Sequence, residues 1–183
     1  MFIETARTLL QSPLPEDAGA ILEYHLRNRL HFKNAMLSVD DDFFTHDYQM
    51  QRIAMQERSA LEGKYFHFYA YSLHKPGIII ADVSAANILK ENRSCQISYK
   101  VDKDYLRQGY GAEITAKLID FLIKTGKIHR FELFVTKDNI PSAKLAEKLG
   151  FEREGIARSY MEINGVWRDH IQYSLIAENN ESR

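Results

Sequence analysis

The chain has 183 residues, enough for one medium-sized domain with a sizeable core, and 45% of them are hydrophobic. Its 24 lysines and arginines nearly balance 25 aspartates and glutamates, so the formal net charge of -1 gives no basic footprint for nucleic acid or an anionic membrane. The single cysteine, Cys95, excludes an intramolecular disulfide and a cysteine-rich zinc site. The charged N-terminus lacks a signal-peptide core, and no apolar run approaches the roughly 20 residues of a membrane span. We therefore expect a cytoplasmic protein, either a monomer or a homodimer.

The first third of the chain predicts one strand followed by two helices. The strand is expected over Ile3–Gln11, and Pro13–Asp17 forms a turn that starts the first helix. The second helix is expected from near Thr45 to Glu62, with Gly63 marking its end. The apolar residues expected to face the core are Ala18, Ile21, Leu22 and Leu26 in the first helix and Met50, Ile53, Ala54 and Leu61 in the second.

Three strand-like segments come next, over Tyr65–Leu73, Ile78–Ala86 and Cys95–Val101. The turn residues His74–Gly77 separate the first two segments, which predicts an antiparallel hairpin. In the third segment apolar and polar residues alternate, so one of its faces is expected to be buried.

The last part of the chain predicts two helices and three strands. A helix with one apolar face follows the glycines at 109 and 111 and ends at Gly126. A strand is expected over Arg130–Thr136, and a helix over Ser142–Leu149. Two final strands, Glu152–Glu162 and Trp167–Ala177, are joined by Asn-Gly, a strong hairpin signal. The order predicts an α/β fold with a mixed, mostly antiparallel central sheet flanked by helices, a single domain over residues 1–177, and a polar tail over 178–183.

The most informative segment is the glycine-rich turn Leu106–Ala112, where a predicted strand gives way to an amphipathic helix. Such a turn exposes backbone N–H groups next to the partial positive charge of a helix N-terminus, so it can hold a phosphate group. It lacks the Lys-Ser/Thr ending of a P-loop and the G-x-G-x-x-G spacing. Taken alone, it is equally typical of a helix entry without a ligand. About thirty residues later, however, Asn139–Ala143 opens a second helix, and the combination indicates a phosphorylated cofactor.

At these residues the sequence resembles the GNAT superfamily of acetyl-CoA-dependent N-acetyltransferases, and within it the ribosomal-protein-alanine N-acetyltransferase branch. The resemblance spans nearly the whole chain. It is carried by five segments in order, namely Ile3–Arg7, Gly109–Glu113, Asn139–Ala143, Leu145–Gly155 and Asn164–His170. It implies a GNAT-like fold and acetyl-CoA as the co-substrate.

The resemblance also implies roles for individual residues. Asn139 would lie against the pantetheine arm, and Ser142 would lie near the cofactor sulfur as the acid that protonates the departing thiolate. Leu106 departs from the family pattern, which has a polar residue at this position, and Arg107 supplies charge one residue along. The residues implied to bind the pyrophosphate and pantetheine of CoA are Val101, Leu106, Arg107, Gln108, Gly109, Tyr110, Gly111 and Ala112.

The chemistry requires an uncharged amine that attacks a thioester. An N-terminal α-amine has a reference pKa of about 8, against about 10.4 for lysine, so modest general-base help is sufficient. Glu113, Glu162 and Tyr160 are the candidates for this help, although Glu113 also suits a first-turn anion of its helix. The thioester oxygen needs a donor, and a strand N–H near Tyr99–Val101 would provide it if that strand splays from its neighbour.

No metal is expected to take part, because the seven histidines lack ligand spacing and the run Asp40–Asp42 reads as a solvated loop. The sequence therefore predicts an enzyme that transfers acetyl directly from acetyl-CoA to an amine, with a protein N-terminus as the favoured acceptor. Two alternatives remain open. One is the same chemistry on a small amine such as an amino acid, polyamine or antibiotic, and the other is a non-catalytic CoA-binding module.

Overall fold

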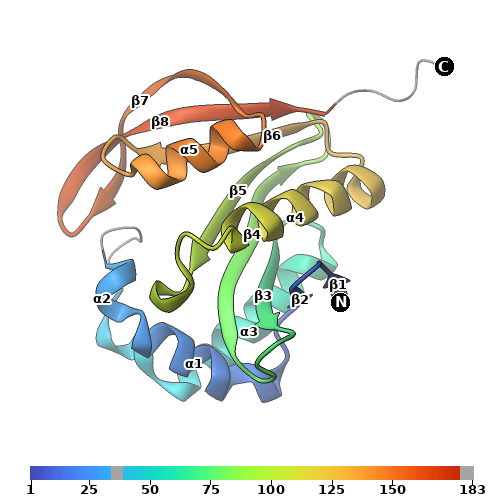
Figure 1. Cartoon of the computed structure of the whole chain (residues 1–183), viewed down its shortest axis with the longest axis vertical. Helices are drawn as coiled ribbons and strands as arrows, with labels where there is room; N and C mark the ends of the chain where they lie inside the picture. The colour runs from blue at the N-terminus through green and yellow to red at the C-terminus, as the bar shows by residue number, and fades with distance from the viewer. Residues whose placement is uncertain (34–38, 178–183) are drawn as a thin grey trace.

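The computed structural model describes residues 1–33 and 39–177. In this part of the chain eight strands form one sheet in the order β1-β2-β3-β4-β5-β6-β8-β7 (Figure 1). The strands are β1 (Phe2–Glu4), β2 (Thr8–Gln11), β3 (Phe66–Ser72), β4 (Ile79–Leu89), β5 (Ser94–Val101), β6 (Arg130–Thr136), β7 (Glu152–Ile163) and β8 (Val166–Ile176). The helices are α1 (Ala18–Arg27), α2 (Arg29–Phe32), α3 (His46–Leu61), α4 (Tyr110–Gly126) and α5 (Ile140–Lys148). Short 3-10 turns cover Pro15–Asp17 (η1), Asp41–Phe44 (η2) and Lys103–Tyr105 (η3).

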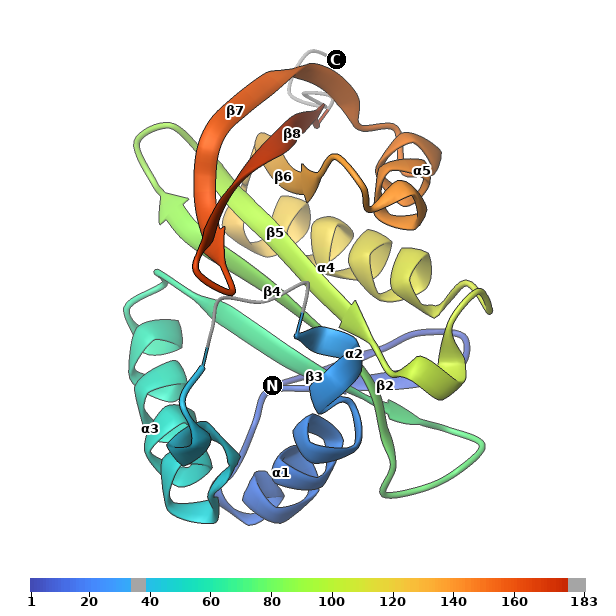
Figure 2. The same ribbon diagram turned by 90° about the vertical axis from the view of Figure 1, so that its left-hand side faces the viewer.

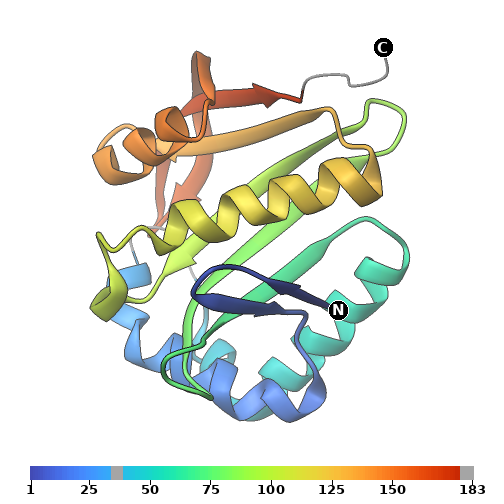
Figure 3. The same ribbon diagram turned by 45° about the vertical axis from the view of Figure 1, so that its right-hand side comes forward.

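Helices cover both faces of the sheet. Helices α4 and α5 lie on one face, and α1, α2 and α3 lie on the other (Figures 2 and 3). Each face has its own apolar core, because successive strand side chains point to opposite sides. On β3, for example, Phe68 and Ala70 belong to the core under α4, whereas Tyr69 belongs to the core under α1 and α3.

The sheet opens between β5 and β6, its only parallel pair among the described strands. Pairing covers three positions, Ser94–Gln96 of β5 against Arg130–Glu132 of β6. Strand β6 continues to Thr136 by pairing with β8, and β5 continues to Val101 by pairing with β4. The two strands therefore diverge after Gln96, and their separation leaves a gap in the middle of the sheet.

The predicted fold class is confirmed, with one parallel pair in an otherwise antiparallel sheet. The β3–β4 hairpin forms as expected, and β6 has the predicted bounds. At the β7–β8 turn, Asn164 and Gly165 both adopt positive φ angles, 52° and 75°, as a two-residue hairpin turn with the Asn-Gly sequence requires. None of the helices in the described ranges is long and apolar enough to cross a membrane.

The prediction of one strand over Ile3–Gln11 is wrong, because the segment folds back on itself at Thr5. The Thr5 hydroxyl accepts a hydrogen bond from the Thr8 N–H at 2.9 Å, and the Thr5 N–H donates to the Thr8 carbonyl at 2.9 Å. A threonine hydroxyl that bonds a backbone N–H a few residues along the chain stabilises a tight turn. Strands β1 and β2 then pair antiparallel, with Phe2 opposite Gln11.

The predicted inward faces of α1 and α3 are partly wrong. Ile21 and Ile53 are buried, but Leu26 and Leu61 are 46% and 85% exposed, and Met50 and Ala54 also face solvent. The face of α3 that packs on the sheet is instead largely polar and carries Gln49 and Gln56 beside Ile53. The side-chain NH₂ groups of these glutamines donate to the Phe43 carbonyl at 2.6 Å and to the His67 ring at 2.8 Å, respectively.

Candidate active site

The glycine-rich turn lies between β5 and α4, next to the gap in the sheet. Arg107 and Gly109 adopt left-handed backbone conformations, with φ of 59° and 84°, and these curl the chain just before the first turn of α4. The first N–H groups of a helix have no acceptor within the helix, so those of α4 are available to an anion. We call Leu106–Ala112 the cradle. The Arg107 side chain is exposed and makes no hydrogen bond to the described residues, so its charge is available to a phosphate as well.

Arg7 braces the cradle from the β1–β2 turn. Its Nη1 donates to the Gln108 carbonyl at 2.9 Å, and its Nε and Nη2 reach Glu113 Oε2 at 2.7 and 2.6 Å. Its guanidinium also lies 4.1 Å from the centre of the Tyr110 ring. Burial alone would raise the pKa of Glu113, but hydrogen bonds from Thr5 and Arg7 outweigh this effect and lower it. Glu113 is therefore engaged in a structural role.

Gly111 allows β5, α4 and α5 to converge beside the cradle. A Cβ atom at this position would lie 3.0 Å from Leu145 Cδ1 and 3.3 Å from both Tyr99 Cε2 and Val101 Cγ2. Contacts this short are tighter than those of most packed side chains, so the neighbouring side chains would have to shift. Glycine therefore permits the N-terminal turn of α4 to approach the end of β5.

Two hydroxyl groups meet where β5 approaches α5. The Tyr99 hydroxyl and Ser142 Oγ are 2.8 Å apart, and either of them can be the donor. Asn139 caps α5, since its Oδ1 accepts from the Ser142 N–H at 3.2 Å, and its amide NH₂ makes no hydrogen bond within the described residues. Burial raises the pKa of Tyr99, and the hydrogen bond with Ser142 offsets part of this rise. The pair is therefore protonated at neutral pH and can pass a proton along.

The backbone of β5 presents unpaired N–H groups to the gap. In an antiparallel ladder alternate residues of a strand direct their N–H groups to the same neighbour. The Asp102 N–H donates to the Ile80 carbonyl at 2.9 Å, which fixes the even-numbered residues of β5 as those that face β4. The N–H groups of Tyr99 and Val101 therefore point toward β6, which has already diverged. They have no partner strand in the described sheet.

The other two predicted catalytic residues lie on β7, away from the Tyr99–Ser142 pair. Tyr160 stacks on Phe134 of β6, with ring centroids 4.2 Å apart and planes within 7°. The neighbours of Phe134 on β6 are buried under α4 and α5, so Phe134 and Tyr160 belong to the opposite face of the sheet. Burial raises the pKa of Tyr160. Glu162 is exposed near the tip of the β7–β8 hairpin, opposite Trp167.

Comparison with known proteins now decides the family. The chain matches the family model described as an acetyltransferase (GNAT) domain over residues 7–152. The chain belongs to the GNAT acetyltransferase family. It is therefore an acyltransferase, as the sequence predicted.

Several relatives that align with this GNAT chain over most of both sequences are named as N-acetyltransferases. It is 29% identical over 177 residues to a probable N-acetyltransferase, YjcK, of Bacillus subtilis, covering 96% of this chain and 97% of that one. It is 28% identical over 176 residues to the [ribosomal protein uS5]-alanine N-acetyltransferase of Escherichia coli, covering 94% and 89%. A solved structure of the ribosomal-protein-S5-alanine acetyltransferase of Vibrio fischeri superposes with a TM-score of 0.92 at 28% identity, covering 98% of both chains. The predicted resemblance is thus confirmed.

The GNAT site contains residues that the sequence did not single out for it. The sequence marks Arg7 only as part of an N-terminal motif, and its contact with Gln108 of the cradle joins residues 101 positions apart. The sequence points to Tyr99 only for its backbone N–H, whereas in the structure its hydroxyl is the partner of Ser142. Among the described residues, no group of three or more histidine, cysteine, aspartate or glutamate side chains is arranged to hold a metal ion.

Proposed function

We propose that this GNAT enzyme transfers the acetyl group of acetyl-CoA to a protein N-terminal α-amine, with a ribosomal protein as the class of acceptor. The observation that carries the proposal is the gap between β5 and β6. The cradle lies at one end of this gap, and the Tyr99–Ser142 pair lies beside it. The gap therefore brings together an anion site, the unpaired N–H groups of β5 and a hydroxyl that can donate a proton.

The described residues fit acetyl-CoA in three places. The cradle N–H groups and Arg107 hold the pyrophosphate. The Val101 backbone and the Asn139 amide bind the pantetheine arm as it enters the gap, and the Tyr99 N–H donates to the thioester oxygen. Gly111 keeps the path open, because a larger residue would push Tyr99 and Val101 into it. The exposed Leu106 side chain has no part in this scheme, since the backbone makes the contacts.

Acetyl-CoA supplies an activated acyl group, whose carbon–sulfur bond breaks as the carbon–nitrogen bond to the amine forms. Ser142 donates the proton that the departing sulfur needs, Tyr99 replaces it through their 2.8 Å hydrogen bond, and a proton from solvent then restores Tyr99. The amine approaches from the opposite face, where Tyr160 lies on Phe134. Its excess proton leaves through water, with Tyr160 and Glu162 as the groups that orient this water.

Two considerations support an N-terminal α-amine as the acceptor. Its reference pKa of about 8 leaves a useful fraction uncharged at neutral pH, unlike lysine at about 10.4. Two relatives aligned over nearly their whole length are named as ribosomal-protein-alanine acetyltransferases. Such an acceptor would place the reaction in the cytoplasm.

Cofactor binding is tested by thermal unfolding with increasing acetyl-CoA. A ligand that binds only the folded state raises the unfolding midpoint, by an amount that grows with its concentration. We expect this rise for the wild type and a much smaller one for Gly109→Asp. An unchanged wild-type midpoint at millimolar acetyl-CoA would overturn the proposal.

Acceptor class is tested by thiol release from acetyl-CoA across a matched panel. One peptide begins with a free alanine, a second is the same peptide with a blocked N-terminus and an internal lysine, and small amines complete the panel. We expect release with the free N-terminus and none with the blocked peptide. Release with polyamines or free amino acids only would make the enzyme a small-amine acetyltransferase instead.

A further inference from the structure

A buried polar cluster joins the end of α1 to the end of β5. Helix α1 ends at Arg27 and α2 begins at Arg29, and we call these residues with Asn28 the α1–α2 corner. Asn28 is fully buried. Its Nδ2 donates to the Tyr24 carbonyl at 2.9 Å and to Asp102 Oδ2 at 2.8 Å. Its Oδ1 accepts from the Lys103 N–H at 2.9 Å.

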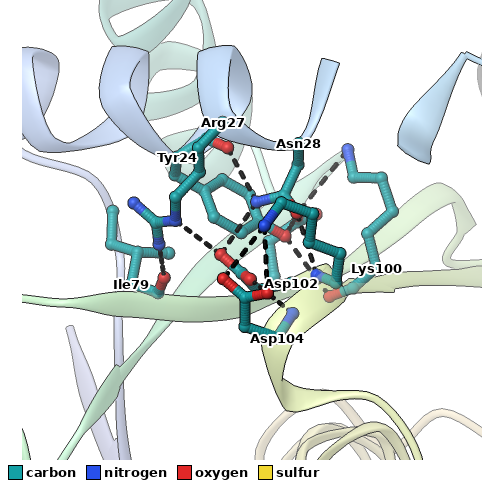
Figure 4. Close-up of polar contacts among 9 residues, drawn as sticks. Tyr24, Arg27, Asn28, Ile79, Lys100, Asp102 and Asp104 are labelled. Atoms are coloured by element: carbon teal, nitrogen blue, oxygen red, sulfur yellow. Dashed lines mark hydrogen bonds and ion pairs between the residues drawn. The ribbon is translucent and has the colours of Figure 1, made fainter. Parts of the chain in front are cut away.

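Asp102 is the centre of this cluster, as Figure 4 shows. Besides Asn28, it accepts from Arg27 Nε at 2.6 Å and from the Asp104 N–H at 3.0 Å. Arg27 also donates to the Ile79 carbonyl at the start of β4. Burial alone would raise the pKa of Asp102, but the hydrogen bonds from Asn28, Asp104 and Arg27 outweigh it and lower the pKa.

Asp102 lies in the chain where it connects the cofactor side of the sheet to the acceptor side. It directly follows Val101 and caps η3, the turn that leads into the cradle. The corner that it holds belongs to the helices on the opposite face of the sheet (Figure 2). At the other end of α2, the Lys33 carbonyl accepts from Asn164 Nδ2 at 3.2 Å, at the tip of the β7–β8 hairpin. The corner and α2 thus form one wall of the face from which the amine approaches.

We propose that Asp102 is a positioning residue that fixes the α1–α2 corner relative to the cradle. As a consequence, acetyl-CoA binding makes the corner and α2, which form the wall on the acceptor side, more rigid. This inference rests on the proposed function, because it takes the cradle as the cofactor site and the opposite face as the acceptor side. Stability alone is a weak reason for such a cluster, since a buried ion pair contributes little net stability over apolar residues of the same shape. Its geometry instead ties the α1–α2 corner and η3 to one carboxylate at the end of β5.

The test variant is Asp102→Asn, which has nearly the same shape. An asparagine Oδ1 can still accept from the Asp104 N–H and keep η3 capped. Its NH₂ group, however, faces the donor groups of Arg27 and Asn28, so the link to the corner is broken. The matched control is Glu154→Gln, which also neutralises a carboxylate that accepts from an arginine, Arg130, and from one further side chain.

Hydrogen exchange of peptides covering residues 18–32 gives a readout that does not require turnover. In the wild type and in Glu154→Gln we expect acetyl-CoA to slow exchange of these amides. In Asp102→Asn we expect exchange about tenfold faster without the cofactor and no response to it, consistent with the loss of a charged hydrogen bond. In steady-state kinetics we expect the acceptor KM of Asp102→Asn to rise about tenfold, with kcat and the acetyl-CoA KM within about twofold of wild type.

Three results would overturn the inference. The first is a corner that responds to acetyl-CoA equally in wild type and Asp102→Asn. The second is a parallel rise of both KM values, and the third is a lower unfolding midpoint with both KM values unchanged. Failure of the proposed function is distinguished separately, by a wild-type midpoint that does not respond to acetyl-CoA, and that result would remove this inference too.

Discussion

Gly111→Ala is the sharpest test of how the site is packed. The added Cβ would meet Leu145 Cδ1 at 3.0 Å and the side chains of Tyr99 and Val101 at 3.3 Å. Alanine also improves helix propensity, so two opposing effects act at this position. Gly19→Ala is the matched control. Gly19 is likewise the second residue of its helix, α1, and a Cβ there would meet nothing within 4 Å.

The two variants separate the opposing effects by subtraction. Replacing glycine by alanine in a helix stabilises by about 0.5–1 kcal/mol, and this gain should appear in full for Gly19→Ala. Overpacking a well-packed site costs about 1–3 kcal/mol, and only Gly111→Ala incurs this cost. We therefore expect Gly111→Ala to be destabilised by about 1 kcal/mol relative to wild type. The difference between the variants, about 1–3 kcal/mol, measures the packing at Gly111.

Urea unfolding followed by circular dichroism measures both free energies of unfolding. Acetyl transfer should report the same displacement, because Tyr99, whose hydroxyl bonds Ser142, is one of the side chains that the new methyl group would press against. We expect Gly111→Ala to lose activity and Gly19→Ala to keep it. If Gly111→Ala were as stable as Gly19→Ala and fully active, the convergence of β5, α4 and α5 would not be tight, and the reasoning would fail.

Three further predictions concern the cradle, the hydroxyl pair and acid stability. Gly109→Asp places a side chain at a φ of 84° and a negative charge in the cradle, so acetyl-CoA affinity by calorimetry should fall more than about tenfold. Ser142→Ala should lower kcat about a hundredfold at unchanged acetyl-CoA affinity, and adding Tyr99→Phe should lower it little further, because the hydroxyls act in series. Burial lowers the pKa of His67 to about 4, so between about pH 6.5 and 4 the unfolded chain binds a proton that the folded one does not. The free energy of unfolding should therefore decrease by about 3 kcal/mol as the pH falls through that range. Urea unfolding of His67→Gln should show a smaller decrease over the same range than the wild type.

The fold could be predicted from sequence where the signal is local. The alternation of Phe131, Leu133 and Val135 with polar residues sets β6, and Asn164-Gly165 sets the last turn. Local periodicity failed where polar residues find distant partners. Gln56 faces inward because His67 Nδ1, on a neighbouring strand, accepts a hydrogen bond from its side-chain NH₂ at 2.8 Å, and no apolar pattern records such a pair.

The candidate site likewise contains features that the local sequence predicts and features that depend on contacts between distant residues. The cradle could be located from two glycines, because the backbone of Gly109 and the close approach at Gly111 each need that residue. The pairing of the Tyr99 and Ser142 hydroxyls could not be predicted, because these residues are 43 positions apart and meet only where β5 approaches α5. A polar residue on an alternating strand gives no sign of which helix it will contact.

Two arginines contact the segment that contains the cradle. Arg27 holds Asp102 ahead of the cradle, and Arg7 holds Gln108 within it and Glu113 directly after it. Arg7 uses three nitrogens on two acceptors at once, which a lysine ammonium on a flexible stem cannot reproduce with the same geometry. The cradle motif is therefore incomplete as a local segment. Its backbone supplies the anion site, Arg7 from the β1–β2 turn fixes the shape of that site, and Arg27 ties the preceding residue Asp102 to the α1–α2 corner.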